Sequence, residues 1–364
     1  MKQIYGRYFL GFSFLFVTCL VDAVEVAGKQ LEIYGKLHLS ANYHNDGQNT
    51  GNSISSNASR IGFKGEHITP TGPLVLWQLE QTIQLDETGG QYATRNSYLG
   101  FGGAYGEILL GHNDTPYKIV AGHWGLFSDL VPDRLALLGA SMLDDVKMND
   151  RGENAALYRH GWHGWEVQVM YSAGNPTAQT SGKADDNAMA MRSYALMYKR
   201  DGLYLGIGYE DWDGMAVTNI NTMNIDRAKL SGLRLAGYNW FGKLQFGFVY
   251  EKTEAADRVN FPHWVKQVYG LSLLYRFNND YELAMHGLET TSYHNSTATG
   301  ARLYGIGLFY NMDKQAQLYL AWAQTLNETN ALYKVADGGH GDIVNPAQPG
   351  ADPYVVSVGM IYQF

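Results

Sequence analysis

The feature that most constrains this chain is a series of β-strand-like segments joined by connections of alternating length. Within a segment, apolar residues stand at every second position, as in 165–172, where the odd positions are apolar and most even ones are polar. Because successive strand side chains point to opposite faces, a period of two gives each strand one dry face and one wet face. Sixteen strands are predicted, at 31–43, 58–67, 73–84, 95–102, 105–112, 153–161, 164–174, 190–200, 202–212, 227–240, 243–254, 265–277, 279–290, 300–311, 314–327 and 353–364.

The connections between these strands alternate strictly between short turns and long loops. Short turns are expected at 68–72, 103–104, 162–163, 201, 241–242, 278 and 312–313. Long polar loops are expected at 44–57, 85–94, 113–152, 175–189, 213–226, 255–264, 291–299 and 328–352. Short turns on one side and long loops on the other are typical of outer-membrane barrels. The pattern therefore predicts an all-β fold, a transmembrane antiparallel β-barrel of about sixteen strands that forms a single domain, 24–364.

Residues 1–23 have the pattern of a cleaved export signal. Basic residues precede an apolar run at 8–20, and Ala23 offers a small residue at a plausible cleavage point. The alternative is an anchoring helix, but the run falls short of the roughly 20 apolar residues that a spanning helix needs. We therefore predict a signal peptide at 1–23, and its removal would leave no thiol because Cys19 is the only cysteine.

Composition argues against several other classes of protein. The chain has 42 Gly, 26 Tyr and 8 Trp with 17% charged residues, which favours pleated strands, tight turns and interfacial aromatic rings over helical packing. A net charge of -8 argues against a nucleic-acid partner, since phosphate binding needs clustered Lys and Arg. The eleven His lack the spacing of metal ligands, so no metal site is predicted. The glycine-rich stretch 100–106 indicates a hairpin turn and not a dinucleotide loop, so no cofactor is expected.

An enzyme of the outer membrane is the alternative from a different class. A barrel lipase or protease would need a His beside a Ser or paired acids on the outer face or the loop rim. His160 and His286 have no such partners at strand spacing. We therefore predict no catalytic residues and no enzymatic activity.

The alternation also assigns basic side chains to the inner face of the barrel. Outward apolar positions in the first two strands leave Lys36 and Arg60 facing inward, and Arg95 opens the fourth strand. A Lys or Arg directed at hydrocarbon costs about 2–4 kcal/mol at the midplane of the bilayer. These charges are therefore expected to face water in the lumen.

The connection at 113–152 is far longer than an ordinary loop and carries many apolar side chains. Among them are Trp124, Phe127 and the run 135–138. An exposed loop would not hold so many apolar side chains, whereas a loop folded against the inner wall could. We therefore expect this third long loop to fold into the lumen.

Several short strings resemble the general bacterial porin family of trimeric, sixteen-stranded diffusion channels. The segment 31–36 looks like the opening strand of that family, and 59–66 resembles its second strand. The segment 127–133 is similar to the acidic part of the family's third loop. Arg151, with Arg159 after it, is placed like the family's sixth-strand arginines. The resemblance covers essentially the whole chain after the predicted signal and is densest in its first half.

This resemblance implies a water-filled channel for passive diffusion of small hydrophilic solutes and ions, narrowed by 113–152. It places a basic group of residues on the wall and an acidic group on the loop, namely Lys36, Arg60, Arg95 and Arg151 opposite Asp129 and Asp133. The field between them would orient dipolar solutes, and size would set the cutoff. A substrate-selective porin for a sugar or an anion is the alternative, with Tyr204 or Tyr319 available to line a sugar track.

The same resemblance implies a homotrimer in the Gram-negative outer membrane, in contact with lipid and lipopolysaccharide. Where the family has an arginine that receives an acidic latch from a neighbouring subunit, this chain has His112. Asp86 or Glu87 would then meet an imidazole, in a weaker and pH-dependent contact. Tyr362 and Phe364, at alternate positions of the terminal strand, look like the signal that the outer-membrane assembly machinery reads.

Overall fold

The computed structural model describes residues 24–25, 29–70, 72–87, 95–142, 148–173, 190–218, 225–256, 264–294 and 296–364. The predicted signal peptide at 1–23 lies outside these residues. None of the helices in the described part of the chain has the length and the apolar character needed to cross a membrane.

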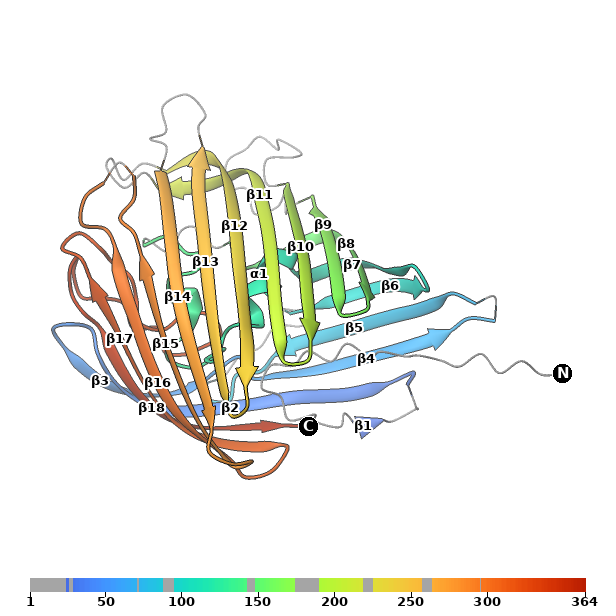
Figure 1. Cartoon of the computed structure of the whole chain (residues 1–364), viewed down its shortest axis with the longest axis horizontal. Helices are drawn as coiled ribbons and strands as arrows, with labels where there is room; N and C mark the ends of the chain where they lie inside the picture. The colour runs from blue at the N-terminus through green and yellow to red at the C-terminus, as the bar shows by residue number, and fades with distance from the viewer. Residues whose placement is uncertain are drawn as a thin grey trace.

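The described residues form one large antiparallel sheet, in which strands adjacent in sequence pair with each other (Figure 1). Two short helices, α1 (Pro116–Gly122) and the 3-10 helix η1 (Arg134–Ala136), lie between β7 and β8. The strands are β1 (Val24–Glu25), β2 (Glu32–Asn45), β3 (Thr50–Ser56), β4 (Arg60–Ile68), β5 (Leu74–Thr82), β6 (Ser97–Gly103), β7 (Gly106–Asp114), β8 (Arg151–Trp162), β9 (Trp165–Ser172), β10 (Met191–Arg200), β11 (Leu203–Thr218), β12 (Ile225–Phe241), β13 (Leu244–Ala256), β14 (Trp264–Arg276), β15 (Tyr281–Thr290), β16 (Ala301–Asn311), β17 (Ala316–Asn327) and β18 (Tyr354–Gln363).

These strands occupy sixteen positions around the barrel wall, as the sequence predicted, and we call each position a stave. β3 and β4 both pair with β2 and are one stave, interrupted at 57–59. β1 is a two-residue strand that pairs only with the start of β2. β2, the combined β3 and β4, and the fourteen strands from β5 to β18 therefore make the sixteen.

Pairing between the first and last staves closes the sheet into a ring. β18 pairs with β2 from Tyr354 opposite Asn45 to Gln363 opposite Lys36. Just beyond this ladder, Gly35 and Phe364 exchange backbone hydrogen bonds of 2.9 and 3.1 Å. Since β9 also pairs with β10, every stave in the described part of the chain has two neighbours. Closure matters because a lipid-exposed sheet edge would leave backbone N–H and C=O groups without partners.

The prediction of a long loop at 44–57 is wrong. β2 continues to Asn45 and β3 begins at Thr50, so only 46–49 connect them. The strand is hard to recognise because its inward side chains are serines that hydrogen-bond to neighbours on the wall. Ser55 contacts Ser40 at 3.1 Å, for example. With a polar residue at nearly every position, the period of two is absent from this stretch.

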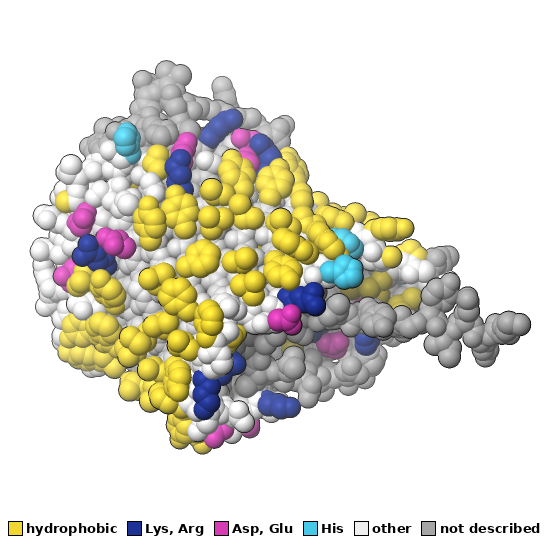
Figure 2. All heavy atoms as spheres, in the orientation of Figure 1, with side chains coloured by type: hydrophobic (Ala, Val, Ile, Leu, Met, Phe, Trp, Pro, Cys, Tyr) yellow, Lys and Arg dark blue, Asp and Glu magenta, His cyan; other side chains and the backbone are white. Residues whose placement is uncertain are grey.

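The outward faces of the strands carry a broad band of exposed apolar side chains. Figure 2 shows this band across the face built by β10 to β14, with charged side chains mostly along its margins. Members include Leu205, Ile207, Phe246, Phe248, Leu271 and Leu273. An apolar belt bounded by charges on the outside of a closed ring is the surface that a bilayer requires.

A charge placed in this band is expected to destabilise the barrel according to its depth. Leu271 lies near the middle of β14 and is 57% exposed, whereas Met312, which is 51% exposed, lies in the short turn after β16. Leu271→Lys should lower the free energy of unfolding in lipid vesicles by about 2–4 kcal/mol, and Met312→Lys by about 1 kcal/mol or less. Denaturant titration of both variants in vesicles measures the difference, and equal costs would argue against a lipid-facing band.

Candidate functional site

The third loop joins β7 to β8 and contains both helices of the described chain. Thr115 caps α1 by accepting a hydrogen bond from the backbone N–H of Lys118 at 3.3 Å, and Pro116 occupies the first helical position. Asp133 caps η1 in the same way, accepting from the N–H of Leu135 at 2.9 Å. These local caps give the loop a defined backbone before it meets the wall.

A fully buried ionic network ties the start of this loop to β12 and β13. Arg234 and Glu251 form an ion pair with both side chains 0% exposed. Glu251 also accepts hydrogen bonds from the Tyr117 hydroxyl at 2.9 Å and from the Gly139 N–H at 2.6 Å. Arg234 donates to the backbone oxygen of Tyr117 at 3.1 Å and lies over its ring. Helix α1 is therefore held on the inner side of the wall, where Figure 1 shows it behind β11 and β12.

Apolar contacts extend the attachment of the loop around the wall. Trp124 stacks on His286 of β15, with ring centroids 5.9 Å apart. Pro132 fills the space left by Gly305 of β16, where an added Cβ would lie 1.8 Å from its Cγ. Phe127 approaches the ring of His286 to 4.8 Å. The third loop thus packs against residues of β12, β13, β15 and β16.

The last loop, 328–353, also turns inward, which the sequence did not predict. Tyr333, Val335 and Ala336 are at most 1% exposed. The loop is tied to the wall by Gly341, whose N–H donates to the Asn57 side chain at 2.9 Å, and by a hydrogen bond between His44 Nδ1 and Asp342 Oδ2 at 2.9 Å. Its backbone also packs on the third loop, because a Cβ added to Gly338 or Gly339 would lie within 3 Å of Asp133 or Asp129.

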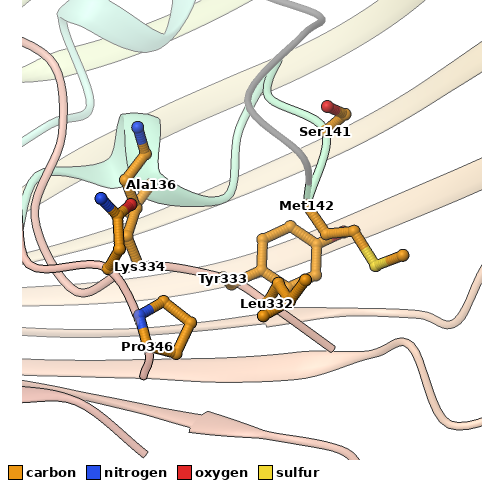
Figure 3. Close-up of a pocket in the computed structure, with 8 residues that line it drawn as sticks. Ala136, Ser141, Met142, Leu332, Tyr333, Lys334 and Pro346 are labelled. Carbon is orange, nitrogen blue, oxygen red and sulfur yellow. The ribbon is translucent and has the colours of Figure 1, made fainter. Parts of the chain in front are cut away.

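The two loops and the strands behind them form one continuous apolar cluster, which we call the lumen core. Its members include Trp124, Phe127 and Leu137 of the third loop and Tyr333 and Val335 of the last. A pocket of about 210 Å³ remains in the seam between the loops (Figure 3). The lumen core fills the side of the barrel built by β10 to β18, and a smaller apolar cluster that includes Leu109, Leu157 and Met170 lies on β7 to β9. The opposite wall, from β2 to β8, also carries charged residues.

That opposite wall begins with a chain of ion pairs around the third-loop carboxylate. Lys36 Nζ lies 2.9 Å from Asp129 Oδ2, and Arg60 lies 3.6 Å from the same oxygen. Arg60 also lies 3.8 Å from Glu80, whose other oxygen contacts Arg95 Nε at 2.5 Å. The contacts thus link four predicted site residues, namely Lys36, Arg60, Arg95 and Asp129. Glu80, which was not predicted, connects Arg60 to Arg95.

The chain of contacts continues through a second carboxylate. Asn96, next to Arg95, donates to Asp114 at 2.9 Å and accepts from Arg151 Nε at 2.9 Å. Asp114 also pairs with Arg151 at 3.3 Å and with Lys118 of α1 at 2.7 Å. We call the whole set the polar belt, made of Lys36, Arg60, Glu80, Arg95, Asn96, Asp114, Lys118, Asp129 and Arg151.

Asp129 and Asp133 have different environments, although the same role was predicted for both. Burial alone would raise the pKa of Asp129, but the charges of Lys36 and Arg60 outweigh it and hold that pKa well below its usual value. Asp133 is 1% exposed and accepts backbone hydrogen bonds from Asp129 and Leu135. Burial raises the pKa of Asp133 to about 6, against the opposing charge of Arg134. The prediction that Asp133 faces the basic wall is therefore corrected, since its carboxylate shapes the turn of the loop.

The residues expected to act in subunit contact and assembly lie elsewhere. Asp86 accepts a hydrogen bond from the N–H of Ser56 at 2.9 Å, and Glu87 beside it is exposed. His112 is half-buried near the end of β7. The rings of Tyr362 and Phe364 lie 6.2 Å apart, and Phe364 packs over Gly35.

The family model for Gram-negative porins matches residues 15–330. The chain belongs to the Gram-negative porin family. Its relatives include the major outer membrane protein P.IB of Neisseria gonorrhoeae, 34% identical over 79 residues, or 21% of this chain and 23% of the relative. Outer membrane protein U of Vibrio vulnificus is 29% identical over 140 residues, or 37% of this chain and 39% of the relative. The matched region thus spans about a quarter to two fifths of these relatives.

Solved porins share the fold over nearly their whole length. An anion-selective porin from Comamonas acidovorans aligns with a TM-score of 0.75 at 17% identity, covering 92% of this chain and 99% of that one. OmpF of Salmonella typhi, in complex with daunomycin, gives 0.70 at 18% identity, covering 94% and 100%. OmpT of Vibrio cholerae in its trimer form gives 0.68 at 15% identity, covering 92% and 99%. This porin is therefore a sixteen-stranded barrel of the Gram-negative outer membrane, and its family agrees with the expectation that it is not an enzyme.

The buried pair that anchors the third loop of this porin is expected to be essential for its position. Glu251→Gln leaves Arg234 as a buried charge without a carboxylate, which should cost about 3–5 kcal/mol of stability and loosen the loop. Limited proteolysis within 115–150 and denaturant titration should both detect the change. Glu289→Gln is the control, because its partner Arg302 is 57% exposed and the pair should contribute about 1 kcal/mol or less. Identical behaviour of the two variants would contradict the anchor.

Proposed function

We propose that this porin forms a water-filled channel through which small hydrophilic solutes and ions diffuse passively across the outer membrane. The observation that carries the proposal is the polar belt on the inner wall of a closed barrel whose outer face is apolar. Unlike the fully buried pair of Arg234 and Glu251, the charged side chains of the belt are partly exposed, and in a dry barrel each exposed charge would lack hydration at a cost of several kcal/mol. A lumen that contains water removes that cost.

The belt also supports a constriction at the level of the third loop. Arg60, Arg95, Arg151 and Asp129 have side chains that are 20%, 18%, 13% and 21% exposed, so each is held by neighbours and still reaches solvent. The lumen core takes up the side opposite them. The aqueous path is therefore confined to the wall built by β2 to β8, and the belt borders it.

Passage through such a path would select solutes by polarity as well as by size. A hydrophilic solute that loses water at the belt regains hydrogen bonds from guanidinium and carboxylate groups, whereas an apolar solute regains nothing. The sugar-selective alternative has less support, because Tyr204 and Tyr319 are 1% and 3% exposed beneath the loops. Aromatic rings covered in this way offer no track to a passing sugar.

Planar-bilayer recordings test both the channel and the constriction. The purified protein should produce discrete conductance steps, and their complete absence would rule out a channel. Asp129→Asn should shift the reversal potential in a salt gradient toward anions, because it removes the carboxylate that partly neutralises Lys36 and Arg60. Asp133→Asn should leave the reversal potential unchanged, since that carboxyl is buried in the loop. Equal shifts in the two variants would refute the assignment of Asp129.

We further propose that three copies assemble into a trimer, as in the trimer form of the similar Vibrio cholerae structure. Glu87 or Asp86 of one copy would contact His112 of its neighbour, while the apolar band contacts lipid and lipopolysaccharide. Tyr362 and Phe364 would be read by the outer-membrane assembly machinery. The exposure of Glu87 and the partial exposure of His112 support this arrangement.

Replacing the imidazole with a permanent cation should strengthen the latch. His112→Arg is expected to raise the temperature at which trimers dissociate in detergent gels at pH 8, where the imidazole is mostly neutral. The combination with Asp86→Asn and Glu87→Gln should cancel the gain. His160→Arg is the control, because His160 lies near the C-terminal end of β8, which pairs with the start of β7 and not with the end that carries His112. No change from His112→Arg would exclude the latch, and a monomer under all conditions would exclude the trimer.

A further inference from the structure

The polar belt has the opposite charge balance to the chain that contains it. The whole sequence carries a formal charge of -8. Within the belt, which is drawn from the described residues, five cations meet three carboxylates and leave an excess of two positive charges. The cations are Lys36, Arg60, Arg95, Lys118 and Arg151, and the carboxylates are Glu80, Asp114 and Asp129.

The excess arises because each wall carboxylate is shared. Glu80 lies between Arg60 and Arg95 and also accepts a hydrogen bond from the Tyr34 hydroxyl at 3.0 Å. One carboxylate neutralises only one of two flanking cations. The side chain of Glu80 is 10% exposed, against 20% for Arg60 and 18% for Arg95, so the cations present more of their surface to water.

A second group repeats the arrangement on the next strands. Asp114 lies between Lys118 and Arg151. Asn96 connects the two groups, because it follows Arg95 in the chain and hydrogen-bonds to both Asp114 and Arg151. The wall from β4 to β8, together with Lys118 of α1, therefore carries two neighbouring cation pairs, each with one positive charge in excess.

The loops reduce the influence of the third carboxylate. Asp129 is paired with both Lys36 and Arg60. The backbone of the last loop also lies against it, since a Cβ added to Gly339 would come within 2.1 Å of its Oδ1. A carboxylate that is held by two cations and covered on one side offsets only part of the positive charge of the belt.

We infer that this channel prefers anions, and that small oxyanions such as carboxylates and phosphate bind briefly at the two cation pairs in succession as they pass. The inference rests on the proposed channel function and names its substrate class. Guanidinium groups present planar pairs of N–H donors that match a carboxylate or phosphate. Two weak neighbouring sites let an ion enter and still leave, which is what conduction requires.

The test uses the full-length protein in planar bilayers under a tenfold potassium chloride gradient. The reversal potential should have the sign of chloride permeation, with an anion-to-cation permeability ratio of at least about 2. Arg95→Gln and Arg151→Gln should each lower that ratio, and Glu80→Gln should raise it. Arg302→Gln is the matched control, because that arginine pairs with Glu289 on the exposed outer surface.

Inorganic phosphate provides a second readout that distinguishes binding from bulk charge. Added to the chloride solution, it should interrupt the current transiently in the unmodified channel and do so at least about threefold less often in Arg95→Gln. Arg95→Lys keeps the charge but loses the planar fork, so it should retain the chloride preference and still lose most of the interruptions. Normal conductance of Arg95→Lys would show that the barrel folds without the guanidinium group, so that lost interruptions in this variant report on binding and not on a folding defect.

The outcomes separate this inference from the function on which it rests. Conductance with a preference for potassium would overturn the inference and leave the channel intact. A preference for chloride that neither Arg95→Gln nor Arg151→Gln lowers would do the same. Interruptions by phosphate that persist in Arg95→Lys and Arg95→Gln would overturn the two binding steps. Absence of conductance from the unmodified protein would instead refute the channel itself.

Discussion

The architecture depends on one constraint, namely that every backbone N–H and C=O group in contact with lipid must find a partner within the protein. A sheet meets this condition only when its two edges pair with each other, here as β2 with β18. The ring then fixes two surfaces of opposite character. Outward positions must be apolar, so charged side chains at membrane depth can point only inward, where the ring encloses a space that water or protein must fill.

This chain fills that space unequally. On the side of β10 to β18, two loops bring their own apolar side chains and pack against the wall as in the interior of a soluble protein. Such packing needs firm polar attachments, and the fully buried pair of Arg234 and Glu251 supplies one because it also binds the backbone of the third loop. On the side of β2 to β8 the wall stays polar, and its ion pairs remain partly hydrated. The asymmetry moves the polar path off the axis of the barrel.

Much of the fold could be predicted from the sequence because lipid on one face and a lumen on the other impose a period of two. β9, at Trp165–Ser172, shows that period clearly and was found almost to the residue. β3 was missed because its inward serines make hydrogen bonds and give no alternation. Lys36 and Asp129 were expected to face each other because of the alternation of inward and outward strand positions and because of the family resemblance. Glu80 was overlooked because other polar residues also stand at alternate positions of its strand. Asp133 was misassigned because sequence alone does not distinguish a capping carboxylate from one that faces solvent.

The inward last loop couples the interior of the barrel to the closure of its wall. This loop leads directly into β18, the strand whose pairing with β2 completes the ring. Gly338 and Gly339 of the same loop pack against Asp133 and Asp129 of the third loop. One segment of chain therefore connects the packing of the third loop to the last ladder of the ring. A substitution that displaces the third loop is then expected to bear on closure of the wall as well as on the polar path.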